Sequence, residues 1–231
     1  MRASESSVSV YFAAGISMMR TSKMFHDAMN DIERRYREKG LQTVRFGCFY
    51  PYGTMDEVPL SKQRRFIAKQ VLTVGMDIYR QAAHTIGGQT LFQDIRKAYD
   101  PVNGGGIVLI GHSGGGIASY KAAQLLNRIG YPVRRVFMIG SPEIPICRDC
   151  RDKVLAVEHS GRWGDWISRC AFHWFRPAKI RVRLPIRGGH PHYFCSKSKD
   201  ENNVTNMQKM TDFLWSWMQG EESVTYSGAN T

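Results

Sequence analysis

Short apolar segments alternate with longer amphipathic segments along the 231-residue chain. The short segments are rich in Val, Ile and Phe, which is typical of strands, whereas the longer ones repeat apolar residues at the helical period of 3.6. This alternation predicts βα units and therefore an α/β fold with a mainly parallel sheet. The chain shows no internal repeat, low-complexity tract or linker, and its length fits one domain over residues 1–231.

Six segments are expected to form strands, and most are almost entirely apolar, as expected where helices cover both faces of a sheet. They are Val8–Ala14, Thr43–Tyr50, Ile107–Gly111, Val133–Gly140, Val154–Glu158 and Ile180–Ile186. In the last of these segments apolar residues alternate with Lys and Arg, which predicts an edge strand protected by charge.

Five segments carry the helical period, with Met and aromatic residues on their apolar sides. They are Thr21–Lys39, Leu60–Thr85, Leu91–Tyr99, Gly115–Ile129 and Val204–Met218. Five helices are enough to cover both faces of a sheet of about six strands, which agrees with the predicted α/β fold.

The chain carries a formal net charge of +12. Such an excess attracts nucleic acid, anionic lipid or acidic substrates. The basic residues are dispersed and no nucleic-acid-binding motif accompanies them, so we expect no nucleic-acid partner but leave contact with anionic surfaces open. No apolar run is long enough to cross a bilayer, which predicts no stable membrane insertion. The N-terminal segment lacks the unbroken apolar centre of a signal peptide, which favours a cytoplasmic location.

The five cysteines are Cys48, Cys147, Cys150, Cys170 and Cys195. An odd number without an export signal predicts reduced thiols. Cys147 and Cys150 form a C-x-x-C motif, which suits half of a zinc site or a redox pair. No second pair of ligands follows, and the surroundings are not thioredoxin-like. We therefore favour incidental thiols and expect neither a metal nor a cofactor.

The segment Gly111-His112-Ser113-Gly114-Gly115 carries the strongest chemical signal. An apolar strand precedes it directly and a helix with small residues follows it. Strand, sharp turn and helix are what a nucleophile elbow requires, and the glycines let the strand and helix approach closely. A phosphate-binding loop is the alternative, but its Gly-Lys-Ser/Thr ending is absent.

This elbow resembles that of the α/β-hydrolase family, the lipase and esterase branch in particular. The resemblance implies that Ser113 is a nucleophile whose acid follows the fifth strand and whose histidine follows the last strand. Asp165, which follows a glycine in a loop, is the favoured acid, and Glu158 is the alternative. His190 in the loop after the last strand is the favoured base, and His192 is the alternative.

An oxyanion hole would take the backbone N–H of Gly114 and a second N–H from an early loop. Ile16 is the favoured second donor, with Ser17 as the alternative. Ser141, in a Gly-Ser-Pro segment after the fourth strand, is expected to line the site. The five other histidines are expected to be surface or packing residues, with His112 pointing away from the chemistry.

These features predict a serine hydrolase that cleaves small-molecule acyl esters through an acyl-enzyme. A thioesterase or acyltransferase would use the same groups, and a non-catalytic binding protein would keep only the scaffold. Residues 60–100 or 144–153 could form a small cap over the site.

Overall fold

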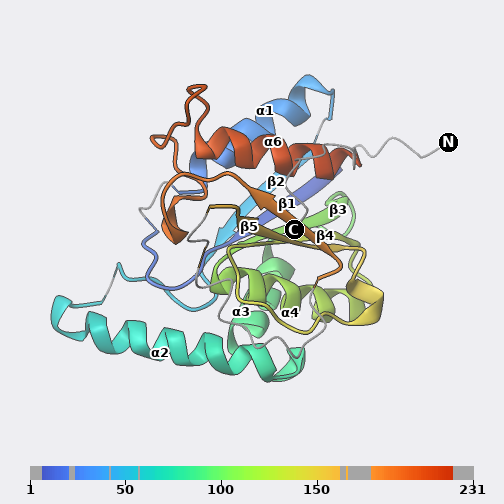
Figure 1. Cartoon of the computed structure of the whole chain (residues 1–231). Coiled ribbons are helices and arrows are strands. Elements are labelled where there is room, and N and C mark those ends of the chain that lie inside the picture. Colours follow the sequence, from blue (N-terminus) through green and yellow to red (C-terminus); the bar gives the residue numbers. More distant parts are fainter. Residues whose placement is uncertain are drawn as a thin grey trace.

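The computed structural model describes residues 7–20, 24–41, 43–56, 58–161, 165 and 178–220. A six-stranded sheet in the order β2-β1-β3-β4-β5-β6 forms its centre, and every neighbouring pair is parallel (Figure 1). The strands are β1 Ser7–Ala13, β2 Thr43–Phe49, β3 Gly106–His112, β4 Val133–Ile139, β5 Val154–His159 and β6 Ile180–Leu184. The predicted fold class, an α/β fold with a parallel sheet of about six strands, is confirmed.

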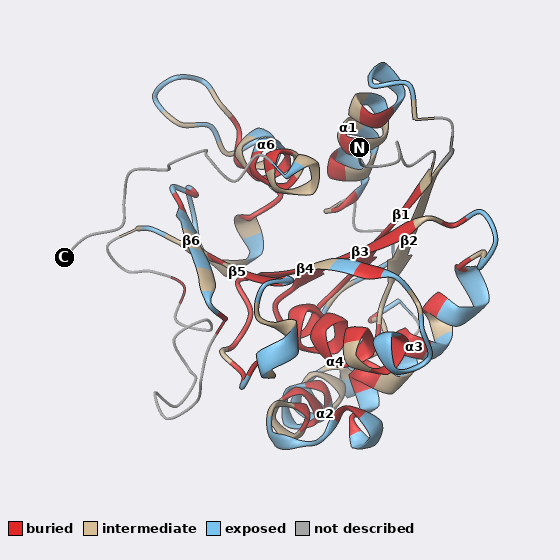
Figure 2. Ribbon diagram, turned by 90° about the vertical axis from the view of Figure 1, so that its right-hand side faces the viewer, coloured by how far each residue is buried: buried red, intermediate tan, exposed pale blue. Residues whose placement is uncertain are grey.

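Helices cover both faces of the sheet. They are α1 His26–Glu38, α2 Leu60–Tyr79, α3 Ile86–Ala98, α4 Gly114–Arg128 and α6 Asn206–Gln219, with short 3-10 turns η1 Ala82–His84, η2 Arg148–Cys150 and η3 His190–His192. The pair α1 and α6 lies on one face, α3 and α4 lie on the other, and α2 lies outside α4 (Figures 1 and 2). Thr21, the predicted start of the first helix, lies outside the described residues.

Side chains that alternate along the central strands fill two separate cores. On β1, Val8, Val10 and Phe12 pack in the core formed with α1 and α6. Tyr11 and Ala13 belong to the opposite core, with α3 and α4. The strand period of two therefore explains how an almost entirely apolar segment serves both layers at once.

β6 is an edge strand, as its alternating pattern predicts. Its residues alternate between half-buried and exposed up to Leu184, which is fully buried. The strand ends there, two residues before the predicted end, and Ile186 continues into a loop while remaining buried.

The connection from β1 determines where a site can form. The chain runs from β1 to β2 on one side and then returns to β3 on the other side of β1. The register pairs Ala13 with Gly111, so the carboxyl ends of β1 and β3 lie side by side. Open α/β sheets bind ligands at such a switch point, and here the Ser113 turn and the loop at Ile16 meet there.

The predicted helix Leu60–Thr85 is wrong in its last six residues. α2 ends at Tyr79, η1 follows, and α3 begins at Ile86, five residues before its predicted start. No glycine or proline stands at the break. The cause is a tertiary contact, because the carboxylate of Asp77 accepts hydrogen bonds from the N–H groups of Ile86 and Gly87 at 3.0 and 2.8 Å. Asp77 thereby caps α3 and turns the chain back.

Asp77 belongs to a buried polar cluster between α2 and α4. Its side chain is fully buried and also accepts a hydrogen bond from the Tyr52 hydroxyl at 3.3 Å. Lys121 of α4 is nearly buried and donates from Nζ to the carbonyl of Arg80 at 2.6 Å. Burial lowers the pKa of Lys121, and the charge of Asp77 opposes that shift. These contacts fix α2 against the rest of the fold.

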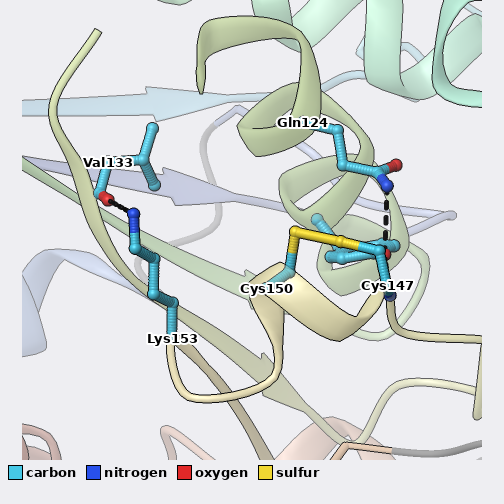
Figure 3. Close-up of a disulfide and its surroundings, with 6 residues drawn as sticks. Gln124, Val133, Cys147, Cys150 and Lys153 are labelled. Atoms are coloured by element: carbon cyan, nitrogen blue, oxygen red, sulfur yellow. Dashed lines mark hydrogen bonds between the residues drawn. A yellow bond between two sulfur atoms is a disulfide. The ribbon is translucent and has the colours of Figure 1, made fainter. Parts of the chain in front are cut away.

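A disulfide joins Cys147 and Cys150 across η2, beside Gln124 of α4 (Figure 3). The turn brings the two Cα atoms to 5.3 Å, within the range that a disulfide spans. The Cys147 N–H donates to the Tyr120 hydroxyl at 2.8 Å and ties this loop to α4. The prediction of reduced, incidental thiols is therefore wrong at this pair.

Cys48 and Cys195 are free thiols, and Cys170 lies outside the described residues. Within the described ranges, none of the helices has the length and apolar character needed to cross a bilayer.

We expect Asp77→Asn to lower the free energy of unfolding by about 3 kcal/mol, because the amide nitrogen cannot accept a hydrogen bond and leaves a buried N–H of α3 unpaired. Urea unfolding followed by circular dichroism measures the loss. Asp152→Asn is the control, since the Asp152 side chain is 80% exposed and its ion pair with Lys179 is at the surface; a change below about 0.5 kcal/mol is expected there. Equal losses in the two variants would contradict the capping role.

Candidate active site

Ser113 occupies a strained turn between β3 and α4. Its backbone has φ 57° and ψ −130°, a conformation that residues with a side chain rarely adopt. Two hydrogen bonds to the β4 segment hold it there. The Ser113 N–H donates to the carbonyl of Ile139 at 2.9 Å, and the Ser141 hydroxyl donates to the carbonyl of Ser113 at 2.7 Å. Ser141 therefore holds the backbone of the turn in place, in addition to its predicted position at the site.

Two glycines make this turn sterically possible. A Cβ atom on Gly115 would overlap the carbonyl group of Ala13 at the end of β1. A Cβ atom on Gly15 would lie 2.7 Å from the Cβ and 3.2 Å from the Oγ of Ser113. The nucleophile candidate therefore lies directly against the loop that follows β1, with no room for a side chain between them.

A carboxylate–imidazole pair lies beside this turn. His190 Nδ1 is 2.6 Å from Asp165 Oδ2. The Asp165 residue is 2% exposed, and the Tyr193 hydroxyl donates a second hydrogen bond to the same Oδ2 at 3.2 Å. Burial and the charge of Asp165 together raise the pKa of Tyr193, which keeps the phenol a donor. The structure thus brings together the favoured acid and the favoured histidine of the sequence prediction.

The two alternative residues have other contacts. Glu158 stays at the end of β5, where Arg181 and Arg183 of β6 each approach its carboxylate to 3.8 Å. The His192 ring packs over Gly188 in its own loop. Within the described part of the chain, neither the Glu158 nor the His192 side chain makes a hydrogen bond with Asp165 or His190.

The prediction that His112 points away from the chemistry is wrong. Its ring lies against the His190 ring, with centroids 4.8 Å apart, and its Nε2–H donates to the carbonyl of His190 at 3.0 Å. Burial, followed by the nearby His190, lowers the pKa of His112 to about 4. A neutral His112 therefore connects the residue before Ser113 directly to the backbone of His190. His173, another histidine of the sequence analysis, lies outside the described residues.

His190 Nε2 is buried and has no hydrogen-bond partner among the described residues. Because Nδ1 faces a carboxylate, the proton belongs on Nδ1 and Nε2 carries the lone pair. A buried lone pair without a partner is costly, which makes Nε2 a candidate acceptor for a donor that arrives during function. Nε2 makes no hydrogen bond with the Ser113 hydroxyl. Hydrogen bonds between a base and its nucleophile are often long before substrate binds.

The candidate donors for the oxyanion hole differ in whether their N–H groups already have a hydrogen-bond partner. Gly114 is the first residue of α4, so its N–H has no partner within the helix. The Ser17 N–H already donates to Gln70 Oε1 at 3.0 Å, which removes Ser17 as a donor. The Ile16 N–H makes no hydrogen bond among the described residues and follows Gly15, which lies against Ser113.

α2 covers the turn, so the predicted cap segment 60–100 lies close to the site. Val74 Cγ2 approaches Gly114 so closely that a Cβ atom there would lie 2.8 Å away. Gln70 is buried. Its Oε1 accepts the hydrogen bond from Ser17, and its Nε2 donates to the carbonyls of Tyr52 and Gly53 at 3.0 and 3.1 Å. Gln70 therefore joins α2 to both loops that border the site.

The loop that carries His190 is held at both ends by Asn206, a fully buried residue at the start of α6. Asn206 pairs with the N–H and carbonyl of Arg187 at 2.9 and 2.7 Å and donates to the carbonyl of His192 at 2.9 Å. Sequence reasoning missed Asn206, Gln70 and the contact of Tyr193. Nothing local distinguishes the first two from surface amides, whereas Tyr193 follows the histidine loop closely enough to have been a candidate.

Among the described residues no group of three or more His, Cys, Asp and Glu side chains is arranged to hold a metal ion. The site offers a serine hydroxyl, an imidazole paired with a carboxylate, and backbone N–H groups. A strained serine between a parallel strand and a helix, with its histidine in the loop after the last strand, is the arrangement of α/β-hydrolases. The chain has the α/β-hydrolase fold.

No family model matches the sequence, and no curated protein matches it either. Solved structures resemble the fold at 12% sequence identity. A covalent complex of the NocB thioesterase domain with a fluorophosphonate nocardicin G analogue aligns over 90% of this chain and 92% of that chain, with a TM-score of 0.49.

The NocB thioesterase domain from the nocardicin cluster aligns over 92% of this chain and 94% of that chain, with a TM-score of 0.48. An iodinated complex of acetyl xylan esterase gives a TM-score of 0.39, over 91% and 94%. At these similarities the resemblance carries no argument about activity.

We expect the stability of the protein to fall between pH 6.5 and about 4 partly because of His112. The unfolded chain takes up a proton on this residue near the ordinary pKa of 6.5, whereas the folded protein takes it up only near 4. Acid therefore favours the unfolded state across this window, by about 3 kcal/mol at its lower end.

Urea unfolding of the wild type and of His112→Gln, near neutral pH and at pH about 4, measures this effect. Glutamine retains an N–H donor for the His190 carbonyl but does not titrate. The variant should lose about 3 kcal/mol less than the wild type on acidification. The same pH dependence in both proteins would show that His112 is not the group responsible.

Proposed function

We propose that the protein is a serine hydrolase that cleaves carboxylic (acyl) esters of small molecules, with Ser113 as nucleophile, His190 as base and Asp165 as the acid that orients it. The observation that carries this proposal is the buried Asp165–His190 pair at 2.6 Å, joined through His112 to the strained turn of Ser113. Nucleophile, base and orienting acid are the three roles that acyl transfer by serine requires.

In the proposed first step, His190 Nε2 accepts the hydroxyl proton of Ser113 while Oγ attacks the acyl carbonyl. The carboxylate of Asp165 stabilises the imidazolium that forms, because it is buried and close to Nδ1. The hydrogen bond from His112 to the His190 carbonyl holds the backbone of the base in place during this transfer.

The negative charge that develops on the carbonyl oxygen needs donors aimed at it. The N–H groups of Gly114 and Ile16 are the proposed donors, and the N-terminus of α4 adds a favourable dipole. His190 then gives its proton to the leaving alcohol, and the acyl group stays on Ser113. Water, activated by the same histidine, releases the acid and restores the hydroxyl. These steps need no cofactor or metal.

We expect wild-type protein to react with a fluorophosphonate probe and Ser113→Ala to fail to react. The probe requires an activated serine, so a scaffold with a purely binding role would not be labelled. Ser196→Ala is the matched control, because Ser196 is an exposed serine in the loop after His190 and should leave labelling unchanged. Labelling that persists in Ser113→Ala would overturn the proposed nucleophile.

A second test separates the two carboxylates. Asp165→Asn should lower kcat/KM for p-nitrophenyl esters by about 10³- to 10⁴-fold, because asparagine favours the wrong imidazole tautomer. Glu158→Gln should change it by less than about threefold, since that carboxylate contacts arginines of β6. The reverse order would reassign the acid.

Assays with esters of graded chain length beside acyl-CoA distinguish an esterase from a thioesterase.

A further inference from the structure

α2 has two faces that differ in what they contact. The inner face carries Gln70, Val74 and Asp77, which contact the loop after β1, the Ser113 turn and the start of α3. The opposite side of the helix points away from α4 at the outer edge of the molecule (Figure 2). A helix of 20 residues is about 30 Å long, so this outer face is extensive.

The outer face carries large apolar side chains that are exposed to solvent, where polar side chains are normally favoured. Leu60 is 85% exposed, Leu72 64% and Val71 52%. Together with Tyr79, these residues make up half of the eight large hydrophobic side chains that are exposed in the described chain. Their concentration on one helix is what marks an interaction surface, since single exposed apolar residues are normal.

The same face is basic and its charges are unbalanced. Lys62, Arg64, Arg65 and Lys69 are all exposed, and none has an ion pair or hydrogen bond to an acid among the described residues. The only acid of the helix is Asp77, which is buried on the inner face.

The basic residues of α1, which is also a surface helix, are neutralised by neighbouring acids. There, Arg34 pairs with Asp31 and Glu38, Arg35 with Asp31, and Arg37 with Glu33. α2 therefore differs from α1 in exposing four cations without a neighbouring acid.

We propose that the outer face of α2 docks on an anionic lipid surface. Lys and Arg side chains attract anionic headgroups, while exposed Leu and Val enter the boundary between headgroups and acyl chains. This pairing of apolar and cationic side chains on one helix face fits such a surface. A second copy of the chain fits less well, because it would bring unneutralised cations against cations.

The docking helix is also rigidly placed with respect to Ser113. Val74 lies against Gly114, and Gln70 holds the loop that contains Ile16. A helix is about 10 Å across, so the lipid surface would lie about one helix diameter from the nucleophile turn. The nature of the substrate, unlike the docking surface, rests on the proposed hydrolase function. With that function, the substrate is an amphiphilic acyl ester that the lipid surface presents to the site.

Sedimentation of the full chain with lipid vesicles tests the docking surface. We expect binding to vesicles of phosphatidylcholine and phosphatidylglycerol in equal parts, weak binding to phosphatidylcholine alone, and release by salt. The variant R64Q/R65Q should bind about 30-fold more weakly, at about tenfold for each 1.4 kcal/mol and about 1 kcal/mol for each cation. The control K97Q/R128Q removes the same charge from exposed sites on α3 and α4 and should change binding by less than about twofold.

The apolar contribution has its own matched pair. Leu72→Gln should weaken vesicle binding on the order of tenfold, because its side chain no longer enters the lipid boundary. Val102→Gln, at a loop residue that is 87% exposed, should leave binding unchanged. Circular dichroism and thermal unfolding confirm that each variant is folded, and neither residue belongs to the cores.

Four outcomes would overturn the inference: equal binding to both vesicle types, equal losses from R64Q/R65Q and K97Q/R128Q, and two that identify another occupant. Binding to polyglutamate that survives Leu72→Gln, without vesicle binding, would indicate an acidic protein partner. Concentration-dependent dimers that Leu72→Gln abolishes would indicate a second copy.

Hydrolysis of a soluble short-chain ester is measured in parallel, so that the two proposals fail separately. Ester hydrolysis without vesicle binding would refute the docking surface alone. Vesicle binding with no loss of hydrolysis in Ser113→Ala would refute the proposed nucleophile alone.

Discussion

The close approach of four backbone segments at Ser113 is the constraint on which the site depends. β1, β3, β4 and the start of α4 come so near one another that glycine is required at Gly15 and Gly115, and a backbone hydrogen bond joins Ser113 to β4. This packing holds a serine at positive φ, a conformation that costs of order 1–3 kcal/mol in isolation. The strain persists because every neighbouring segment is itself fixed by the sheet.

The groups around Ser113 are positioned by residues that do not themselves react in the proposed chemistry. His112 joins the elbow to the backbone of His190, and Asn206 holds the ends of the His190 loop. On the other side, Gln70 connects α2 to the loop that contains Ile16. All three are buried polar side chains whose hydrogen bonds go to backbone groups. Such contacts fix loops with little freedom, because each unmade bond would leave a buried polar group unpaired.

Charge is distributed unevenly over this fold, and the difference between helices carries information that the net charge does not. α1 neutralises its arginines with acids one turn away, whereas α2 exposes four cations and no acid. α2 is also the helix whose inner face touches the elbow. The surface proposed for anionic lipid and the proposed catalytic turn therefore lie on opposite sides of α2. Gln70 and Asp77 on the inner face hold α2 in this position through hydrogen bonds to backbone groups.

The local sequence by itself determined the order of strands and helices, the elbow at Ser113 and the candidate loops for Asp165 and His190, because hydrophobic period and turn residues act over a few neighbours. It misplaced the end of α2, since the break depends on Asp77 capping a helix that begins nine residues later. It also missed the Cys147–Cys150 disulfide and the contact of His112 with His190. Only the tertiary structure decided these features, and the choice of Asp165 over Glu158 as the partner of His190, because each depends on which side chains meet once the chain has folded.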